Sequence, residues 1–533
     1  MLPAEKIKEA LKRYWGYDAF RPKQEAIVRD ILAERDACVV MPTGGGKSLC
    51  YQLPAALQIE KTAIVVSPLI ALMQDQVAQL TQMGISAAVL NSSQGWNEQR
   101  KTERRAERGE LRLLYLSPER LAKPEMIGWL KKVPVSFFVI DEAHCISEWG
   151  HEFRPDYREL KLLKKEFPAA PIAAFTASAT HRVRHDIIEQ LKLKDPGKFI
   201  ASFHRPNLNY QVLESDNFTQ TDRLLAILKK HEGHPAIVYS PTIKRVGSTV
   251  AMLAEEGIAA IGYHAKMDSA ERQRNQERWM SDEVNVLVGT IAFGLGINKP
   301  NVRAVVHLAL PKSLEQYYQE AGRAGRDGMR SDCVMLWQKR DTALLAYFIE
   351  QVADEAEKAR GWQRYRDITG FASSQQCRHK RICAHFGETV AWGKCGACDF
   401  CLGGFALGDL SDVEVIQQVA VVPSALRASN RKRDRRGFPA AAGREFAAKP
   451  IKSAPKLDSP LLQILKDWRR ERARQDKVPA FVIFHDLVLL EIASARPRTL
   501  AALSRIKGIG ESKLMRYGEE ILRLVGKGSA AGK

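Results

Sequence analysis

One eight-residue segment, Met41-Pro42-Thr43-Gly44-Gly45-Gly46-Lys47-Ser48, constrains the fold of this chain more than any other feature. An apolar run that ends at Val40 precedes it, and a segment with helical character follows it. Glycines between a strand and a helix let backbone N–H groups converge on phosphate oxygens, and the helix N-terminus adds its partial positive charge. We therefore expect a nucleotide-binding P-loop. In it Lys47 binds the β- and γ-phosphates of ATP, and the Ser48 hydroxyl binds Mg²⁺.

Short apolar, β-branched runs alternate with amphipathic segments over the first 340 residues, a pattern typical of parallel sheets flanked by helices. In the first half the runs lie at 37–41, 62–67, 111–116 and 137–140. The pattern starts again after Phe203-His204-Arg205-Pro206-Asn207, with runs at 236–240, 284–289 and 302–308. The second half contains no Gly-Lys-Ser or Gly-Lys-Thr. We therefore expect an α/β fold with two lobes joined near residue 204, of which only the first carries a P-loop.

An acidic pair, Asp141-Glu142, directly follows the run at 137–140 and continues as Ala143-His144. An acidic pair after a strand also occurs simply as a helix start. Because a P-loop stands earlier in the chain, we expect Asp141 to hold Mg²⁺ through water and Glu142 to polarise the attacking water.

The second lobe carries the segment Gln319-Glu320-Ala321-Gly322-Arg323-Ala324-Gly325-Arg326. A guanidinium from this lobe can stabilise charge that develops on the γ-phosphate when the two lobes close. We expect Gln319, Arg323 and Arg326 to act in catalysis. Ordinary salt bridges from two arginines on one helical face are the alternative.

These motifs together resemble the helicases of superfamily 2, and further segments resemble the RecQ family specifically. The segments are Gly16-Tyr17, Phe20-Arg21-Pro22-Lys23-Gln24 and the run from Cys145 to Tyr157 just past Asp-Glu-Ala-His. The resemblance covers about residues 10 to 403. It implies two RecA-like lobes in an ATP-dependent helicase that moves 3′ to 5′ on single-stranded DNA, unwinds forked DNA and acts in repair and recombination.

The resemblance also implies roles for individual residues at the nucleotide. Tyr17 would stack on adenine, while Arg21 and Gln24 contact its edge. An amide such as Gln24 can pair with the N6/N7 edge of adenine. Arg326 would be the arginine finger.

An aromatic-rich segment from Trp149 to Tyr157 resembles the DNA-sensing loop of the family. It would report DNA occupancy to the acidic pair, and its predicted DNA contacts are Trp149, Phe153, Arg154 and Tyr157. The alternative is a buried helical face formed by the three aromatics, which Pro155 disfavours.

Two segments depart from the family pattern. Thr176-Ala177-Ser178-Ala179 has serine where the family usually has threonine, a change that keeps the hydroxyl. Tyr239-Ser240-Pro241-Thr242 matches the usual motif of the second lobe only loosely, so the resemblance assigns it no specific DNA contact.

Five of the nine cysteines fall between Cys377 and Cys401, which in a cytosolic protein favours a metal over disulfides. The last three have the spacing that turns thiolates toward one tetrahedral ion. The resemblance selects Cys377, Cys395, Cys398 and Cys401 as ligands of a structural Zn²⁺. Cys383 competes for the first position and could instead face the core.

The chain carries a formal net charge of +19, which indicates a polyanionic partner, although a solvated basic surface would give the same value. The charged N-terminal segment does not look like a secretory signal, and no apolar run approaches a membrane span. We expect a cytoplasmic protein that uses ATP, Mg²⁺ and Zn²⁺, binds single-stranded and forked DNA and does not bind membranes.

Changes in composition and pattern divide the chain into five expected parts. These are lobe 1 (1–203), lobe 2 (204–340), a zinc module (341–407), a basic flexible linker (408–457) and an all-α domain (458–529).

The last of these parts resembles the HRDC domain shared by RecQ helicases and ribonuclease D. Its Gly508-Ile509-Gly510 turn could approach a phosphate or serve packing alone. Only 56 residues separate Cys401 from Asp458, so we expect the winged-helix domain of many relatives to be absent or replaced.

Two other functions stay open at this point. One is an RNA helicase or a translocase that does not unwind, and the other is a non-enzymatic scaffold that binds DNA through its zinc and basic segments. The intact set of Lys47, Asp141, Glu142 and Arg326 argues against the scaffold.

Overall fold

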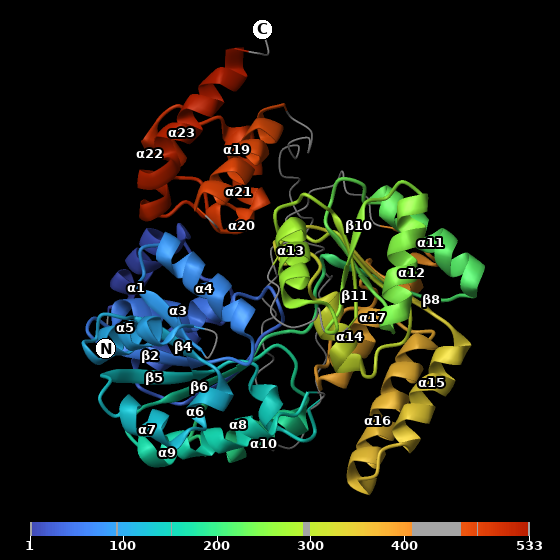
Figure 1. The fold of residues 1–533 in the computed structure, drawn as a ribbon, viewed down its shortest axis with the longest axis horizontal. Coiled ribbons are helices and arrows are strands. Elements are labelled where there is room, and N and C mark those ends of the chain that lie inside the picture. The colour runs from blue at the N-terminus through green and yellow to red at the C-terminus, as the bar shows by residue number, and fades with distance from the viewer. Residues whose placement is uncertain are drawn as a thin grey trace, which may run out of the picture.

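The computed structural model describes residues 3–407 and 460–530, except 92, 93, 151, 291–298 and 477. It shows two α/β lobes side by side, a helical zinc module attached to the second and a helical C-terminal domain above the first (Figure 1). The expected basic linker, with its cluster between Arg427 and Arg436, lies outside the described residues.

Lobe 1 is built on a seven-stranded parallel sheet in the order β3-β4-β2-β5-β6-β1-β7. The strands are β1 (Ala37–Val40), β2 (Thr62–Val66), β3 (Ala87–Leu90), β4 (Leu113–Leu116), β5 (Val135–Ile140), β6 (Ile172–Thr176) and β7 (Gly197–Ile200). The main helices are α1 (Ala4–Ala10), α2 (Gln24–Leu32), α3 (Lys47–Leu57), α4 (Ile70–Gln82), α5 (Trp96–Glu107), α7 (Pro124–Leu130) and α10 (His181–Gln190). The inner strands are buried on both faces, which explains their unbroken apolar runs.

Lobe 2 repeats this design with six parallel strands in the order β10-β11-β9-β12-β13-β8. The strands are β8 (Leu208–Glu214), β9 (Ala236–Tyr239), β10 (Ala260–Tyr263), β11 (Val286–Gly289), β12 (Ala304–His307) and β13 (Ser331–Trp337). The helices are α11 (Asn217–Lys230), α12 (Ile243–Glu255), α13 (Ser269–Met280) and α14 (Leu314–Ala321). The strands predicted in both halves are present, and the expectation of two parallel-sheet lobes is confirmed.

The zinc module consists of α15 (Lys339–Glu350), α16 (Glu355–Ala372), α17 (Arg378–His385) and α18 (Asp399–Leu402). The long hairpin of α15 and α16 projects below lobe 2 (Figure 1). Near the lobe junction the ring of Phe203 stacks on Phe386 of the module, with centroids 4.3 Å apart. Arg184 of lobe 1 donates a hydrogen bond to the Phe386 carbonyl (2.5 Å). The module therefore contacts lobe 1 as well as the lobe to which it is attached.

The C-terminal domain contains α19 (Pro460–Asp476), α20 (Ala480–Ile483), α21 (Asp486–Ala495), α22 (Leu500–Leu503) and α23 (Glu511–Ala530). Its own apolar core includes Leu465, Leu489 and Tyr517. Within the described ranges, no helix is both long enough and apolar enough to cross a membrane.

Candidate nucleotide and DNA site

The P-loop lies between β1 and α3, as predicted. Gly44 and Gly46 have φ values of +80° and +81°, a left-handed conformation that glycine adopts without strain. Lys47 begins α3, and its Nζ lies 3.3 Å from the carbonyl oxygen of Met41. Burial lowers the pKa of Lys47, and the carboxylates of Glu142 and Asp141 oppose this shift. The predicted lysine and the predicted acidic pair thus lie in the same cleft.

Asp141 and Glu142 follow β5, the strand between β2 and β6 in the sheet. Burial, with a smaller contribution from the Glu142 carboxylate, raises the pKa of Asp141 to about 7. Two adjacent carboxylates suit a divalent cation, because its charge offsets the cost of ionising a buried acid. Glu142 has a φ of +48°, a conformation that is unusual for a residue with a side chain and is often found at functional sites.

The arginine motif of lobe 2 approaches the P-loop of lobe 1 just past the end of α14. A Cβ atom on Gly44 would lie 3.2 Å from the Cα of Arg326. Burial and the positive charges of Arg323 and Arg205 lower the pKa of Arg326 to about 9. The two lobes therefore form one composite cleft, with the predicted finger against the phosphate-binding loop.

A polar contact also crosses between the lobes, at the last turn of α14. The Gln319 side chain donates to the Ser178 hydroxyl of lobe 1 (2.8 Å). Ser178 is the residue that departs from the family pattern, and it still provides an acceptor. The hydroxyl, which serine and threonine share, is the part of the side chain that this contact uses.

Arg205, noted in the sequence only as part of the lobe junction, was not predicted as a residue of this cleft. The buried guanidinium donates from Nη1 to the Thr43 carbonyl of the P-loop (2.5 Å). Its Nη2 donates to the Gly325 carbonyl of the arginine motif (2.9 Å). One side chain thus joins the backbones of both nucleotide motifs. The Arg-Pro-Asn sequence at the junction is the signal that could have drawn attention to it.

Two of the three residues predicted to contact adenine lie at the P-loop backbone. Arg21 Nη1 donates to the Gly44 carbonyl (2.6 Å), and Gln24 Nε2 donates to the Gly46 carbonyl (3.1 Å). The Gln24 side-chain oxygen accepts the Arg21 N–H (2.9 Å). Tyr17 is half-buried and packs against the core of lobe 1. Arg21 and Gln24 thus border the P-loop, and the contacts of all three side chains with a base stay a prediction.

The aromatic-rich segment is not a single buried helical face. Trp149 is 40% exposed and Phe153 is 37% exposed, whereas Tyr157 in α8 (Pro155–Arg158) is fully buried. The guanidinium carbons of Arg182 and Arg360 lie 3.0 and 5.3 Å from the Trp149 ring centroid. Exposed rings beside guanidinium groups suit stacking on bases.

Tyr157 occupies a position that presents no ring face to a base. Its hydroxyl donates to the Asp141 carbonyl (2.9 Å). We therefore propose that Tyr157, instead of contacting DNA, connects the aromatic-rich segment to the acidic pair. Arg154 is partly exposed, its backbone N–H donates to the Cys145 carbonyl (2.9 Å), and it stays a predicted DNA contact.

The four selected cysteines meet as expected. The sulfur atoms of Cys377, Cys395, Cys398 and Cys401 all lie within 4.8 Å of one another, and those of Cys395 and Cys398 are 3.4 Å apart. These separations fit a tetrahedral ion with Zn–S bonds of about 2.3 Å. Hydrogen bonds, chiefly from Cys395, lower the pKa of Cys398 to about 5. Cys383 is fully buried in the apolar core, which agrees with the alternative that it faces inward.

The Gly508-Ile509-Gly510 turn packs against lobe 1. The Gly508 N–H donates to the Gly16 carbonyl (3.2 Å), next to Tyr17. A Cβ on Gly510 would lie 2.6 Å from the Tyr14 carbonyl oxygen. In lobe 2, Asn301 donates to the Asp486 carboxylate of α21 (3.0 Å). The turn therefore packs against lobe 1, and its approach to a phosphate stays a prediction.

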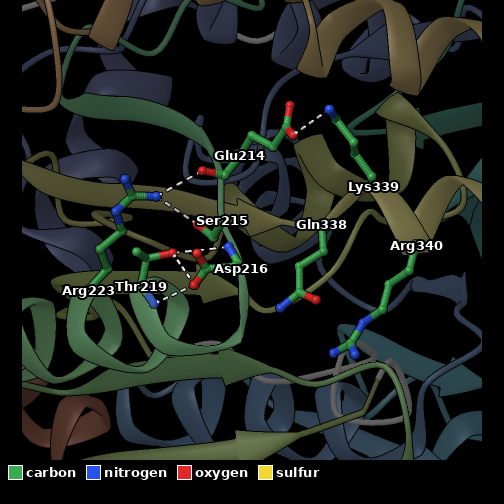
Figure 2. Close-up of a pocket in the computed structure, with 8 residues that line it drawn as sticks. All are labelled: Glu214, Ser215, Asp216, Thr219, Arg223, Gln338, Lys339 and Arg340. Carbon is green, nitrogen blue, oxygen red and sulfur yellow. Dashed lines mark hydrogen bonds and ion pairs between the residues drawn. The ribbon is translucent and has the colours of Figure 1, made fainter.

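A separate hollow of about 540 Å³ lies on lobe 2, at the carboxyl ends of β8 and β13 (Figure 2). Several of its polar groups already have partners: Lys339 pairs with the Glu214 carboxylate at 3.5 Å, and Arg223 donates to the Glu214 carbonyl (2.9 Å). Asp216 caps the N-terminus of α11. The hollow is distinct from the composite cleft, and we assign it no function.

Models of four known families match this chain in succession. They are a DEAD/DEAH box helicase domain (residues 21–187), a helicase conserved C-terminal domain (219–328), a RecQ zinc-binding domain (339–402) and an HRDC domain (458–525). The first two cover the two lobes, and the third covers the module with the four cysteines. The sequence motifs and the geometry of the cleft therefore agree with the families that match.

Curated relatives extend the similarity over nearly the whole chain. The chain is 34% identical to the ATP-dependent DNA helicase RecQ of Pasteurella multocida (strain Pm70), covering 97% of this chain and 93% of that protein. It is also 34% identical to the protein of the same name from Bacillus subtilis (strain 168), covering 97% and 98%. The Pasteurella alignment spans 591 positions, more than the 533 residues of this chain. The relative therefore has residues that this chain lacks.

Solved structures share the fold at low sequence identity. Mss116p bound to ssRNA and AMP-PNP matches with a TM-score of 0.54 and 18% identity, covering 72% of this chain and 88% of that one. The helicase MrfA bound to DNA and AMPPNP matches with a TM-score of 0.52 and 21% identity, covering 63% and 51%. These likenesses establish the two-lobed fold and carry no further weight.

Proposed function

The chain belongs to the RecQ family of helicases, and we propose that it couples ATP hydrolysis to 3′-to-5′ movement on single-stranded DNA and to unwinding of forked duplexes. The observation that carries the proposal is the composite cleft, where Arg326 of lobe 2 lies against Gly44 of the P-loop. A cleft assembled from two lobes links the chemistry of hydrolysis to their relative movement. A role in DNA repair and recombination fits this family.

Each motif of the cleft has a distinct task in this proposal. Lys47 neutralises the β- and γ-phosphates, and Ser48 and Asp141 hold the Mg²⁺ that accompanies ATP. Glu142 orients and polarises the attacking water. Arg326 stabilises the charge that develops on the transferred phosphoryl group, and Gln319 and Arg323 hold the arginine motif in place. Because the finger comes from lobe 2, efficient turnover requires closed lobes.

The base-binding part of the proposal concerns Tyr17, Arg21 and Gln24. Arg21 and Gln24 border the P-loop, where they donate hydrogen bonds to its backbone carbonyls. Exchange of these carbonyls for an adenine edge would select ATP over GTP, since an amide pairs with adenine in a way that guanine does not offer.

DNA binding is proposed for Trp149, Phe153 and Arg154. Two exposed rings provide stacking surfaces, and Tyr157 connects this segment to the backbone of Asp141. Contact with a base would thus be transmitted to the residues that hold Mg²⁺ and activate water. This connection supports hydrolysis that responds to single-stranded DNA.

We propose that this chain lacks the winged-helix domain. Strand separation then depends on another element. The interval between the zinc-binding and HRDC matches is short, and the longer bacterial relatives have residues that this chain lacks.

We also propose a cytoplasmic location. Reduced metal-binding thiols and a DNA substrate support it.

The deciding experiment measures unwinding of forked, tailed and blunt duplexes of DNA and of RNA under one set of conditions, with the ATPase rate recorded for each. We expect ATP-dependent unwinding of forked DNA with a 3′ tail, and none by the Lys47→Ala variant. ATPase activity without strand separation would instead support a translocase. Preference for RNA would support an RNA helicase. DNA binding without any ATP hydrolysis would support a scaffold.

A further inference from the structure

A histidine, a cysteine and a glutamate meet just past the acidic pair, outside the four-cysteine cluster. His144 and Cys145 lie in the short helix Ala143–Ile146 and are each 1% exposed. Glu152 belongs to the aromatic-rich segment, and its side chain is 27% exposed. The His144 Nε2 lies 3.8 Å from the Cys145 sulfur and 4.0 Å from a Glu152 carboxylate oxygen. One ligand atom from each residue lies within 4.8 Å of the other two.

These separations are close to those of a metal site. Zinc bonds of about 2.0–2.3 Å in tetrahedral geometry place ligand atoms roughly 3.3–3.8 Å apart. The observed distances exceed this range by a few tenths of an ångström at most for the two pairs with His144. A small inward movement of the Glu152 side chain, which is the most exposed of the three, would close the difference.

The other ring nitrogen of His144 has the support that metal-bound histidines usually have. This nitrogen, Nδ1, lies 3.0 Å from the Thr176 hydroxyl and 3.3 Å from a Glu142 carboxylate oxygen. A proton on Nδ1, directed at these oxygens, leaves the Nε2 lone pair directed at the thiol and the second carboxylate. A carboxylate beside the far nitrogen fixes the tautomer and strengthens the histidine as a ligand.

We propose that His144, Cys145 and Glu152 form a second metal site that binds Zn²⁺ and inhibits the motor. Three protein ligands leave one position for water, unlike the closed four-thiolate cluster. A bound ion would fix Glu152, and with it the aromatic-rich segment, against the helix that follows Glu142. Movement of this segment on DNA binding would then no longer be transmitted to the residues that carry out hydrolysis.

Binding is tested by adding Co²⁺, without nucleotide, to full-length protein whose four-cysteine cluster already holds zinc. Cobalt bound to a thiolate gives a charge-transfer absorption, so we expect one additional cobalt per chain with this band. Cys145→Ser should abolish the band, and Glu152→Gln should weaken binding by more than the roughly tenfold typical of losing an outer-shell partner. The matched control is Cys38→Ser, which removes a buried thiol elsewhere in lobe 1.

Metal analysis must show that the zinc of the cluster stays in place during the titration. No additional cobalt, or a band that persists in Cys145→Ser, would overturn the site. His144 would then act only as an ionic bridge between the carboxylates of Glu142 and Glu152.

Inhibition is measured separately, because it rests on the proposed ATPase activity whereas the titration does not. Zn²⁺ in slight excess over protein should reduce DNA-stimulated ATPase of the wild type and leave Cys145→Ser unaffected, with equal rates when no zinc is added. Equal inhibition of both proteins would assign the effect to zinc–ATP or to another site and overturn the inhibitory role. Cobalt binding without inhibition by zinc would overturn the inhibitory role and still support the metal site.

Discussion

Both lobes are parallel sheets between helices, but the groups that they direct into the shared cleft differ in charge. Lobe 1 provides two carboxylates and Lys47 at the carboxyl ends of its strands, while lobe 2 provides the guanidinium groups of Arg323 and Arg326. Burial, and after it the charge of Arg323, disfavours the protonated form of Arg326, so a polyanion between the lobes would relieve the repulsion between the two arginines. A repeated fold can thus divide one reaction between two copies.

The largest effect on ATP hydrolysis is expected from Arg326→Ala, which removes the contribution of lobe 2. The variant should bind ATP with nearly normal affinity, because lobe 1 holds the phosphates, and hydrolyse it up to about 10³-fold more slowly. Single-turnover hydrolysis and nucleotide binding, measured on the same protein, separate the two steps. Arg326→Lys is the matched control, since it keeps a charge without the planar fork and should rescue little. Equal losses of binding and turnover would make Arg326 a structural residue and remove the contrast between the lobes.

A smaller effect is expected from Arg205→Ala, which removes the connection between the two motif backbones. Hydrogen bonds from a charged donor contribute about 1.5–3 kcal/mol, so turnover should fall about ten- to hundredfold. Arg205→Lys cannot reach both carbonyls at once and should restore only part of the rate. Thermal melting of both variants shows whether the loss lies in the cleft. If the turnover rate fell only in proportion to the amount of folded protein, Arg205 would have no role in lobe closure.

Trp149→Ala should change how lobe 1 senses DNA without changing the cleft. Stacking contributes about 1–3 kcal/mol per base, so the DNA concentration for half-maximal stimulation should rise about five- to hundredfold. Basal ATPase should persist. Phe218→Ala, which removes an 84% exposed aromatic of lobe 2, is the control and should change nothing. If both variants lose stimulation equally, DNA sensing is not confined to lobe 1.

The smallest effect on activity is expected from Gly510→Ala. The added methyl group would meet the Tyr14 carbonyl at 2.6 Å and should weaken docking of the C-terminal domain on lobe 1 by about 1–3 kcal/mol. Hydrogen exchange of residues 13–16 should then increase, while turnover changes little. Gly526→Ala has open space around its Cβ and provides the control. Unchanged exchange in Gly510→Ala would show that the domain is not held by this turn.

The sequence predicted those parts of the fold and the site that depend on neighbouring residues. The P-loop, the acidic pair and the three closely spaced cysteines are each contiguous, so spacing alone indicated their chemistry. Six strands were not predicted: β3, β6, β7, β8, β10 and β13. Ile172–Thr176 is rich in alanine, Gly197–Ile200 is a half-exposed edge, and polar residues such as Gln211 and Asp332 interrupt the apolar pattern of β8 and β13. Edge strands, alanine-rich strands and strands with polar residues lack the continuous apolar run that marks a buried strand in the sequence.

Contacts between distant segments could not be predicted from spacing. Arg205 acts on carbonyl groups more than 100 residues away in either direction, and carbonyls leave no trace in the side-chain sequence. Tyr157 was grouped with Trp149 and Phe153 because the segment from Trp149 to Tyr157 resembles the DNA-sensing loop of the family. Helix α8 begins at Pro155, after the two exposed aromatics, and Tyr157 lies in this helix, fully buried.

The hydrogen bonds from Arg205 to two main-chain carbonyls have a genetic consequence. Every amino acid presents the same carbonyl, so substitutions at Thr43 or Gly325 would leave these acceptors chemically unchanged. A loss of Arg205 therefore cannot be repaired by a compensating side chain at either partner, as a broken ion pair can be by charge reversal. A suppressor screen with an Arg205 variant should return changes elsewhere on the lobe surfaces, or reversion of the arginine itself.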